Sequence, residues 1–381
     1  MKKLIQGGNI HNAIVAEAFV ADILIENGKI AAIAPQLPVP EDAEVICASG
    51  KQIYPGFVEA HSHIGLAGYG MGESGTDINE KNDIVTPHLR GIDGIKPTVQ
   101  YLTKAAKAGV TTVCVGPGSS NVVGGTFAAI KTVGVRVDDM LIRDGVAMKC
   151  AFGENPKRHY ANKRDCSRMT TAAILRELLF KTREYMRKKD AAGQEWSKHP
   201  TFDIKLESMI PVLRGEMPLK VHAHEAEDIF TALRIAKEFQ VKVTLEHVTE
   251  GHLIAKELAK ENVPLAVGPL MCNASKVEVR NMDNCTPGVL AAAGCQVSII
   301  TDSPVIRQEF LPIIAGMAVK AGMDPFQALQ AITINPARHI GVEDRVGSLE
   351  VGKDADLVIT DGDPFESMTN VELVLIEGKP V

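Results

Sequence analysis

The sequence predicts an α/β protein, a (β/α)8 TIM barrel with a small β-sandwich domain formed from both termini. Eight short runs rich in β-branched residues alternate with helical stretches between residue 53 and about residue 340. A span of roughly 290 residues suits such a barrel. The segments before and after this span both have the pattern of β structure, which predicts a separate domain outside the barrel.

The strands of the barrel are predicted from eight apolar runs. They are FVEAHS (57–62), TTVCVG (111–116), TFAAIKT (126–132), VAMKCAF (146–152), LKVHAH (219–224), KVTLEH (242–247), VPLAVG (263–268) and QVSIIT (296–301). Between them, apolar residues recur at spacings of three and four in 95–109, 172–189, 229–240 and 252–262, which indicates helices. A doubly wound open sheet is the alternative interpretation of this alternation.

The terminal segments predict one small domain. Residues 19–35, FVADILIENGKIAAIAP, contain two alternating runs joined by ENGKI, which is a hairpin signal. The end of the chain has two more such runs, in 346–364 and 371–381. We therefore expect residues 1–52 and 345–381 to form the small β domain and residues 53–344 to form the barrel between them.

Composition excludes several classes of partner. Of 381 residues, 45% are hydrophobic, yet no apolar run has the length of a membrane helix, and the start lacks a signal-peptide core. The net charge of −6 has no basic stripe, which argues against nucleic acid. Seven scattered cysteines fit a reduced, cytoplasmic protein. We expect a small-molecule substrate, a homo-oligomer, and neither a nucleic-acid nor a membrane partner.

Metal-ligating residue types gather at the predicted strand ends. His61 and His63 are two apart, so on a strand they point to the same side. The other strand ends carry Lys149, His222, His224, His247 and Asp302. The carboxyl ends of barrel strands form one face, where the active sites of such barrels lie. Histidine and carboxylate are ligands of zinc and similar ions, so the sequence predicts a divalent metal site there.

Several of these motifs resemble the amidohydrolase superfamily. PGFVEAHSH (55–63), TDSP (301–304) and 335–359 carry the resemblance, which covers essentially the whole chain and is closest to the imidazolonepropionase and prolidase-like branches. The resemblance implies five metal positions, His61, His63, His222, His247 and Asp302. His224 lies one step nearer the rim, where a substrate contact and a supporting role are both open.

Lys149 decides between one metal ion and two. A lysine inside an apolar strand is costly unless it is paired. AMKCAFGE (147–154) resembles a segment of dihydroorotase-like enzymes, in which the lysine becomes a carbamate bridging two metals. The resemblance therefore implies a carboxylated Lys149 and two ions, most simply zinc, with manganese or iron as alternatives. The other reading is a lysine that bends outward to a helix carboxylate.

The predicted site suits hydrolysis of a C–N bond in an amide, a small peptide or a cyclic amide. A divalent ion lowers the pKa of water and polarises a carbonyl, and Asp302 would act as the general base. VHAHE (221–225) also resembles the H-A-G-E segment of adenosine deaminase-like enzymes. That resemblance implies an alternative, deamination of a nitrogen heterocycle at a single metal with Glu225 as the proton shuttle. A catalytically silent binding protein is the third possibility, although no expected ligand is missing.

The loop after the fourth strand predicts the substrate charge. Residues 153–169 carry Lys157, Arg158, Lys163, Arg164 and Arg168 against two acidic residues. Arginine can bind a carboxylate through two hydrogen bonds, so we expect a carboxylate-bearing substrate with Arg158 as its contact. The alternative is that these charges only solvate a surface loop.

Overall fold

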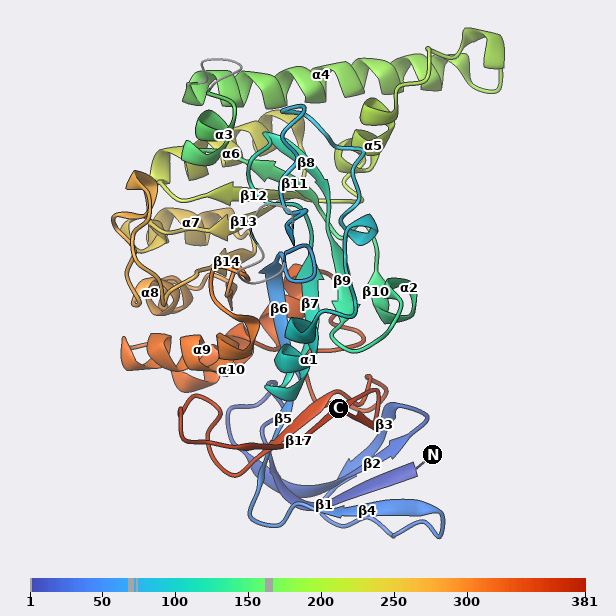
Figure 1. Cartoon of the computed structure of the whole chain (residues 1–381), viewed down its shortest axis with the longest axis vertical. Helices are drawn as coiled ribbons and strands as arrows, with labels where there is room; N and C mark the ends of the chain where they lie inside the picture. The colour runs from blue at the N-terminus through green and yellow to red at the C-terminus, as the bar shows by residue number, and fades with distance from the viewer. Residues whose placement is uncertain (1, 68–71, 73–74, 162–166) are drawn as a thin grey trace.

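The two ends of the chain pair in one sheet in the lower part of the molecule. The computed structural model describes residues 2–67, 72, 75–161 and 167–381 (Figure 1). The sheet has the order β18-β17-β16-β5-β1-β2-β3, with β4 paired to β1. Its strands are β1 (Lys2–Ile10), β2 (Phe19–Glu26), β3 (Lys29–Ala34), β4 (Ala43–Cys47), β5 (Gln52–Pro55), β16 (Leu357–Thr360), β17 (Val371–Ile376) and β18 (Lys379–Pro380).

The terminal sheet forms where the sequence predicts β structure, but as one sheet. The ENGKI hairpin is confirmed, since β2 pairs with β3 across Asn27 and Gly28, both with positive φ. Antiparallel pairing of β16 with β5 joins the C-terminal strands to the N-terminal ones. The expected two-layered sandwich is not seen in this pairing, because all eight strands belong to the same hydrogen-bonded sheet.

The central strands form two further sheets. One has the order β10-β9-β7-β6 and the other β15-β14-β13-β12-β11-β8. Strands β6 and β7 pair in parallel, as do β11 to β15. The bounds are β6 (Phe57–Ser62), β7 (Val110–Val115), β8 (Val123–Thr126), β9 (Ala128–Lys131), β10 (Leu141–Arg143), β11 (Met148–Ala151), β12 (Leu219–Ala223), β13 (Val243–His247), β14 (Leu265–Val267) and β15 (Val297–Ile299).

The third predicted strand differs from the expectation. Residues 126–132 do not form a parallel strand, because β9 runs antiparallel to β7 and β8 runs antiparallel to β11. Only residues 116–122 separate β7 from β8. A parallel neighbour needs a crossover of a dozen or more residues, so this short connection enforces reversal of the chain. The extended segment 123–131 thereby links the two central sheets.

Helices flank the central sheets on their outer side (Figure 1). The predicted helices are confirmed as α1 (Gln100–Lys107), α4 (Arg168–Ala192), α6 (Ala226–Phe239) and α7 (Ala255–Glu261). The others are α2 (Val137–Met140), α3 (Glu154–His159), α5 (Ile204–Leu213), α8 (Thr286–Ala292), α9 (Leu311–Lys320), α10 (Pro325–Ala331) and α11 (Ile334–His339). Within the described ranges, no helix combines the length and apolar character needed to cross a bilayer.

Short 3-10 helices lie between several of these strands and helices. The 3-10 helices are η2 (Gly91–Asp93), η3 (Trp196–Lys198), η4 (Gly251–Leu253), η5 (Val277–Val279) and η6 (Gln308–Phe310).

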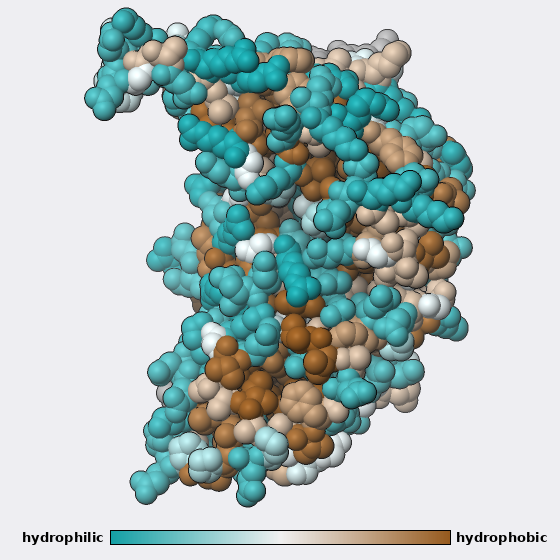
Figure 2. All heavy atoms as spheres, turned by 180° about the vertical axis from the view of Figure 1, so that it is seen from behind, coloured by the Kyte–Doolittle hydropathy of each residue, from teal (hydrophilic) through white to brown (hydrophobic). Residues whose placement is uncertain are grey.

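Seen from behind, apolar side chains gather in the lower part of the molecule, whereas polar ones cover much of the rest (Figure 2). In the terminal sheet, Val20 is 63% exposed and Val45 is 45% exposed. That sheet therefore presents apolar surface to the solvent.

A buried ion cluster ties the terminal sheet to the central ones. Lys131 of β9 places its Nζ 3.0 Å from Asp354 Oδ2 and 2.6 Å from Asp356 Oδ2. All three residues are about 95% buried. Burial raises the pKa of Asp356 although Lys131 opposes the rise. Lys131 therefore compensates the charge of Asp356, and it shares the compensation of Asp354 with Arg345, whose Nη2 lies 2.7 Å from Asp354 Oδ2.

We expect Lys131→Ala to lower the free energy of unfolding by about 3–5 kcal/mol, because it leaves the buried Asp356 without its ion-pair partner and removes one of the cations that contact Asp354. Urea denaturation followed by circular dichroism measures this loss. Lys29→Ala is the matched control, since Lys29 contacts the same Asp354 at 3.2 Å but its side chain is 54% exposed. That variant should lose less than about 1 kcal/mol. Equal losses in both variants would contradict the role given to Lys131.

Candidate metal centre

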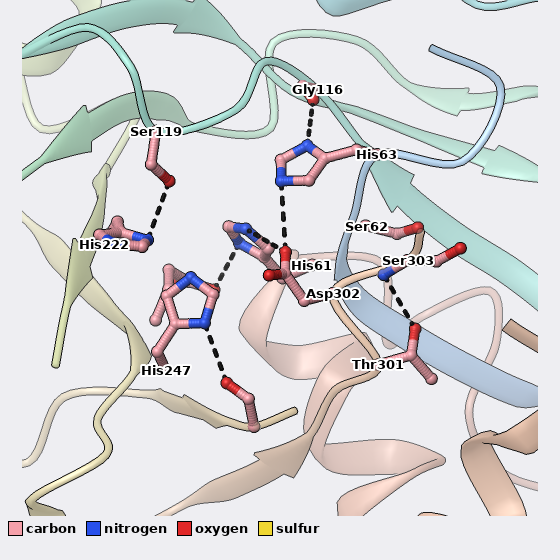
Figure 3. A network of polar contacts seen from close by, with 12 residues as sticks. His61, Ser62, His63, Gly116, Ser119, His222, His247, Thr301, Asp302 and Ser303 are labelled. Carbon is pink, nitrogen blue, oxygen red and sulfur yellow. Dashed lines mark hydrogen bonds and ion pairs between the residues drawn. The ribbon is translucent and has the colours of Figure 1, made fainter. Parts of the chain in front are cut away.

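Five histidines meet at the carboxyl ends of β6, β12 and β13. His61 lies in β6, His222 in β12 and His247 ends β13, while His63 directly follows β6 (Figure 3). His224 directly follows β12. Each is at most 6% exposed. Neighbouring ring centroids are 4.3 to 5.3 Å apart, from His222–His247 to His61–His247. The structure thus brings together the histidines that the sequence predicts for a metal site.

Each of these histidines has its Nδ1 engaged by the protein. The partners are Glu246 Oε2 for His61 (3.0 Å), Gly116 O for His63 (2.7 Å), Ser119 Oγ for His222 (2.8 Å), Thr249 Oγ1 for His224 (2.7 Å) and Gly268 O for His247 (2.9 Å). Against a carboxylate or carbonyl acceptor, Nδ1 must donate, so Nε2 keeps its lone pair. This fixed orientation is typical of metal-binding histidines.

Candidate ligand atoms form two groups that share one residue. His222, His224 and His247 form the first, and His61, His247 and Asp302 form the second. Within each group, the ligand atoms all lie within 4.8 Å of one another. Asp302 Oδ1 is 3.3 Å from His63 Nε2 and 3.7 Å from His61 Nε2. His224 therefore belongs to a candidate ligand group. The sequence had left a substrate contact and a supporting role open for it, and both stay predictions.

The protonation states of the centre suit a cation. Burial lowers the pKa of His61, His222 and His224 well below the usual value, and that of His247 to about 4. Burial alone would raise the pKa of Asp302, but His247 and His63 outweigh it and the pKa is lowered. At neutral pH the site consequently offers neutral imidazoles and a carboxylate, the forms that bind metals.

Two buried nitrogens test whether a metal fits. The Nε2 atoms of His224 and His247 have no hydrogen-bond partner in the part of the chain that the structure describes. Buried polar atoms in proteins are nearly always satisfied, so an unpaired pair in one cluster needs an explanation. Both histidines belong to the first ligand group. A divalent ion would satisfy them, and the residues present therefore fit a metal.

Asp302 is held in a strained conformation by buried contacts. Its φ is 51°, and His247 has a φ of 75°. Such values are uncommon outside glycine and cluster at functional sites. The neighbouring Thr301 N donates to Glu59 Oε2 at 2.9 Å, and Gln308 Nε2 donates to the same oxygen at 2.8 Å. Glu59 thereby fixes the turn that presents Asp302 to the histidines.

Lys149 reaches the centre from β11, as predicted. The residue is fully buried, and its Nζ is 3.3 Å from His61 Nε2. The Nζ also lies 5.6 Å from the ring centroid of Phe127. Burial lowers the pKa of this lysine to about 8. The side chain does not bend outward to a helix carboxylate, so that reading is wrong.

Asp302 and four of the histidines, His63, His222, His224 and His247, line a cavity of about 260 Å³. Ser119, Thr249, Cys272 and Lys276 are also in its wall. Lys276 Nζ is 3.0 Å from Asn155 Oδ1 and 2.5 Å from Glu278 Oε1. Among the described residues, the lining therefore contains one lysine, which the sequence analysis did not single out.

The structure does not bring Arg158 to the cavity. The chain turns into α3 directly after β11, and Arg158 lies exposed in the last turn of that helix. Lys163 and Arg164 lie outside the described residues, and Arg168 forms ion pairs with Glu225 and Asp228. The proposed contact between Arg158 and the substrate stays a prediction, and the exposed position of Arg158 on α3 does not support it.

Sequence reasoning missed a buried network beneath His61. Glu246 Oε2 contacts Lys220 Nζ at 2.9 Å, and Glu246 Oε1 contacts His339 Nε2 at 2.9 Å. Lys220 and His222 are two apart on one strand, so the alternation that marks His61 and His63 could have drawn attention to Lys220. Nothing in the sequence could pair it with His339, which is 119 residues away.

Comparison with known proteins places the chain. The amidohydrolase family model matches residues 182–381. The crystal structure of an amidohydrolase from Thermotoga maritima MSB8 superposes with a TM-score of 0.96 at 39% identity, covering 99% of both chains. The chain belongs to the amidohydrolase family. The resemblance read from its motifs is thereby confirmed, and so is the mixed α/β class of the fold.

Curated members of the family are more distant. Amidohydrolase tasK of Hapsidospora irregularis is 28% identical over 91% of this chain, and an imidazolonepropionase of Symbiobacterium thermophilum is 26% identical over 87%. Adenine deaminase 1 of Latilactobacillus sakei is 21% identical over 99%. This amidohydrolase spans 38% of the length of tasK, 82% of the imidazolonepropionase and 57% of the adenine deaminase.

Proposed function

We propose that this amidohydrolase is a metal-dependent hydrolase that cleaves a C–N bond in a small amide, peptide or cyclic amide. The observation that carries the proposal is the pair of ligand groups that share His247. The unpaired Nε2 atoms of His224 and His247 support a bound ion, and the family's curated relatives include imidazolonepropionases, a dihydroorotase and adenine deaminases. A silent binding protein would have no use for such a preserved ligand set.

We propose two divalent ions, most simply zinc, with manganese or iron as alternatives. His61, His63 and Asp302 would hold one ion, His222 and His224 the other, with His247 reachable from both groups. A carboxylated Lys149 would supply oxygen ligands beside His61. When bound, such ions lower the pKa of water and polarise a carbonyl. Neutral imidazole and carboxylate donors suit these borderline metals.

Asp302 would carry the proton in the reaction. Its carboxylate faces the histidines and is kept ionised, so an oxygen is free to accept a proton from the attacking water. The same carboxyl group would then return this proton to the departing nitrogen. The strained backbone and the Glu59 contacts hold the group in place, which lowers the cost of orienting it during the reaction.

Deamination with Glu225 as the shuttle receives less support. Glu225 Oε1 is 3.1 Å from Arg280 Nη1, and Arg168 forms a further ion pair with the same carboxylate. The side chain does not line the cavity that contains the histidines. A carboxylate engaged by two arginines outside the cavity is poorly placed to protonate a ring nitrogen there.

The architecture is best interpreted as a distorted barrel with a terminal domain. His63 N donates to Ser303 O at 2.7 Å, which brings the end of β6 next to the turn after β15. The two central sheets would then follow one another around a common interior, with 123–131 as the reversed third strand. We retain 1–52 with 345–381 as the small domain and 53–344 as the barrel.

The homo-oligomer expected from the sequence stays a prediction. Analytical ultracentrifugation of the purified protein would test it.

Metal analysis of the purified protein tests the proposed function. We expect close to two divalent ions per chain and turnover in a library of dipeptides, N-acyl amino acids and cyclic amides. A chain that binds no divalent metal, or that hydrolyses none of these classes when loaded with zinc or manganese, would contradict the proposal. Ammonia released from a nitrogen heterocycle alone would favour the deaminase alternative.

A carboxylate on the substrate is supported by Lys276 in the cavity wall. We expect Lys276→Met to raise KM for an acid substrate about tenfold or more, because a hydrogen bond to a charged group is worth roughly 1.5–3 kcal/mol. The KM of the corresponding neutral amide should change little. Steady-state kinetics on both substrates measures the difference. Arg158→Ala is the matched control. A raised KM for the acid in Lys276→Met together with an unchanged KM in Arg158→Ala would support recognition by Lys276. A raised KM in Arg158→Ala alone would refute recognition by Lys276.

A further inference from the structure

Glu278 is a buried carboxylate for which the function proposed above has no role. It lies in η5 and is 3% exposed. Its Oε1 is 3.7 Å from Nε2 of His222 and 3.7 Å from Nε2 of His224. Apart from an ion pair with Lys276, this oxygen has no partner among the residues that the structure describes. Two imidazole nitrogens and one carboxylate oxygen thus face the same small region.

The carboxylate is held from behind. Its Oε2 accepts a hydrogen bond from Glu154 N at 2.6 Å, at the start of α3. The preceding residue, Gly153, has a φ of 78°, and a Cβ added there would lie 2.2 Å from Oε2. A side chain at position 153 would therefore displace the carboxylate. The glycine leaves room for Glu278, and the Oε2 contact turns Oε1 towards the histidines.

If another cation bound Glu278 Oε1, Lys276 would lose this ion pair but would keep its hydrogen bond to Asn155. Its Nζ lies 2.5 Å from Oε1 but also 3.0 Å from Asn155 Oδ1. Asn155 in turn places its Nδ2 3.4 Å from His222 Nε2. The lysine and the asparagine both line the cavity, so they face the same space as the histidines. A second cation near His222 would compete with Lys276 for the carboxylate.

We propose that Glu278 is an additional ligand of the ion held by His222 and His224, an inference that rests on the metal-dependent function proposed above. Carboxylate oxygens are regular ligands of zinc, manganese and iron beside imidazole. With Glu278 on the ion, Lys276 becomes available for the carboxylate of a substrate. Glu278 thereby couples the metal centre to substrate recognition.

The test measures metal binding rather than turnover. Wild type, Glu278→Gln and Gly153→Ala are loaded with zinc, and the ions per chain and their affinities are determined by elemental analysis and chelator competition. We expect one ion in both variants to bind about 10–100-fold more weakly or to be lost, which is the range found when groups supporting a metal site are removed. The other ion, at His61 and Asp302, should remain.

Three control variants separate this role from indirect effects. Glu225→Gln changes a buried glutamate that pairs with Arg168 and Arg280 instead of facing the histidines. Gly193→Ala introduces a side chain at a φ of 56° with nothing within 4 Å of the added Cβ, so it reproduces only the backbone strain of Gly153→Ala. Lys276→Met removes the ion-pair partner of Glu278. All three should keep both ions.

The outcomes distinguish the inference from the proposal on which it rests. Loss of one ion in Glu278→Gln and Gly153→Ala, with both ions kept in the controls, supports Glu278 as a ligand. Wild-type affinity for both ions in Glu278→Gln overturns it, as does an equal loss in Lys276→Met, which would show that the glutamate acts only through the lysine. A wild-type chain with a single ion refutes the two-ion centre instead, and Glu278 then survives only if its variant weakens that ion.

Discussion

Asp302→Asn should abolish turnover while the fold stays intact. The change removes the group that would accept and return the proton in the proposed mechanism, yet it barely alters side-chain volume. A general acid–base step is typically worth about 10²–10⁴ in rate, and loss of a charged metal ligand adds to this. The carboxylate oxygen lies 3.3 Å from His63 Nε2 and belongs to a ligand group with His61 and His247. The measurement is kcat at saturating substrate and metal.

The comparison variant for this experiment is Asp22→Asn. Asp22 is also a buried aspartate, 5% exposed, but it lies in the terminal sheet, where it accepts hydrogen bonds from Gly7 N and Leu37 N at 2.9 Å each. Turnover in that variant should stay at the wild-type level. If Asp302→Asn kept more than about a tenth of the activity with metal bound, a base step worth at least 10² would be ruled out.

The sequence was sufficient to predict the cluster of candidate ligands because strand geometry is local. Residues two apart on a strand share a side, so His61 and His63 could be assigned to one site from their spacing alone. His247 and Asp302 could be added because barrel chemistry sits at strand ends. Lys149 was predictable since a lysine in an apolar strand needs a reason to be there. All these signals lie within a few residues of sequence.

Other features depend on contacts that no local pattern records. Glu278 follows β14 in an irregular segment without periodicity, and only the folded chain brings it to His222, 56 positions earlier in the sequence. Arg158 was expected over the cavity because loops after barrel strands face the site, but a short helix turns it to the solvent. The reversed strand 123–131 had a strand-like pattern, and only the short connection before it fixes its direction.

Lys149→Ala is the second variant for which we expect complete loss of activity. The lysine is fully buried, with His61 Nε2 3.3 Å from its Nζ and Lys220 buried nearby as a second cation. An uncompensated ammonium next to metal ions would repel them, whereas a carbamate at this nitrogen carries a negative charge and two donor oxygens. The wild-type chain should hold close to two ions, and the alanine variant one or fewer.

Lys149→Glu distinguishes the carbamate from a merely structural lysine. Glutamate supplies a carboxylate on a shorter side chain, so it should restore part of the metal content that alanine loses, even if turnover stays low. Elemental analysis gives the ion count, and NMR of protein prepared in ¹³C-bicarbonate should show one carbamate carbon that is absent from both variants. A wild-type protein with an unmodified lysine and a single ion would refute the two-ion centre. The proposed two-ion centre would need a negative charge at this position, because neutral histidines contribute none and Asp302 supplies a single carboxylate to its ligand group.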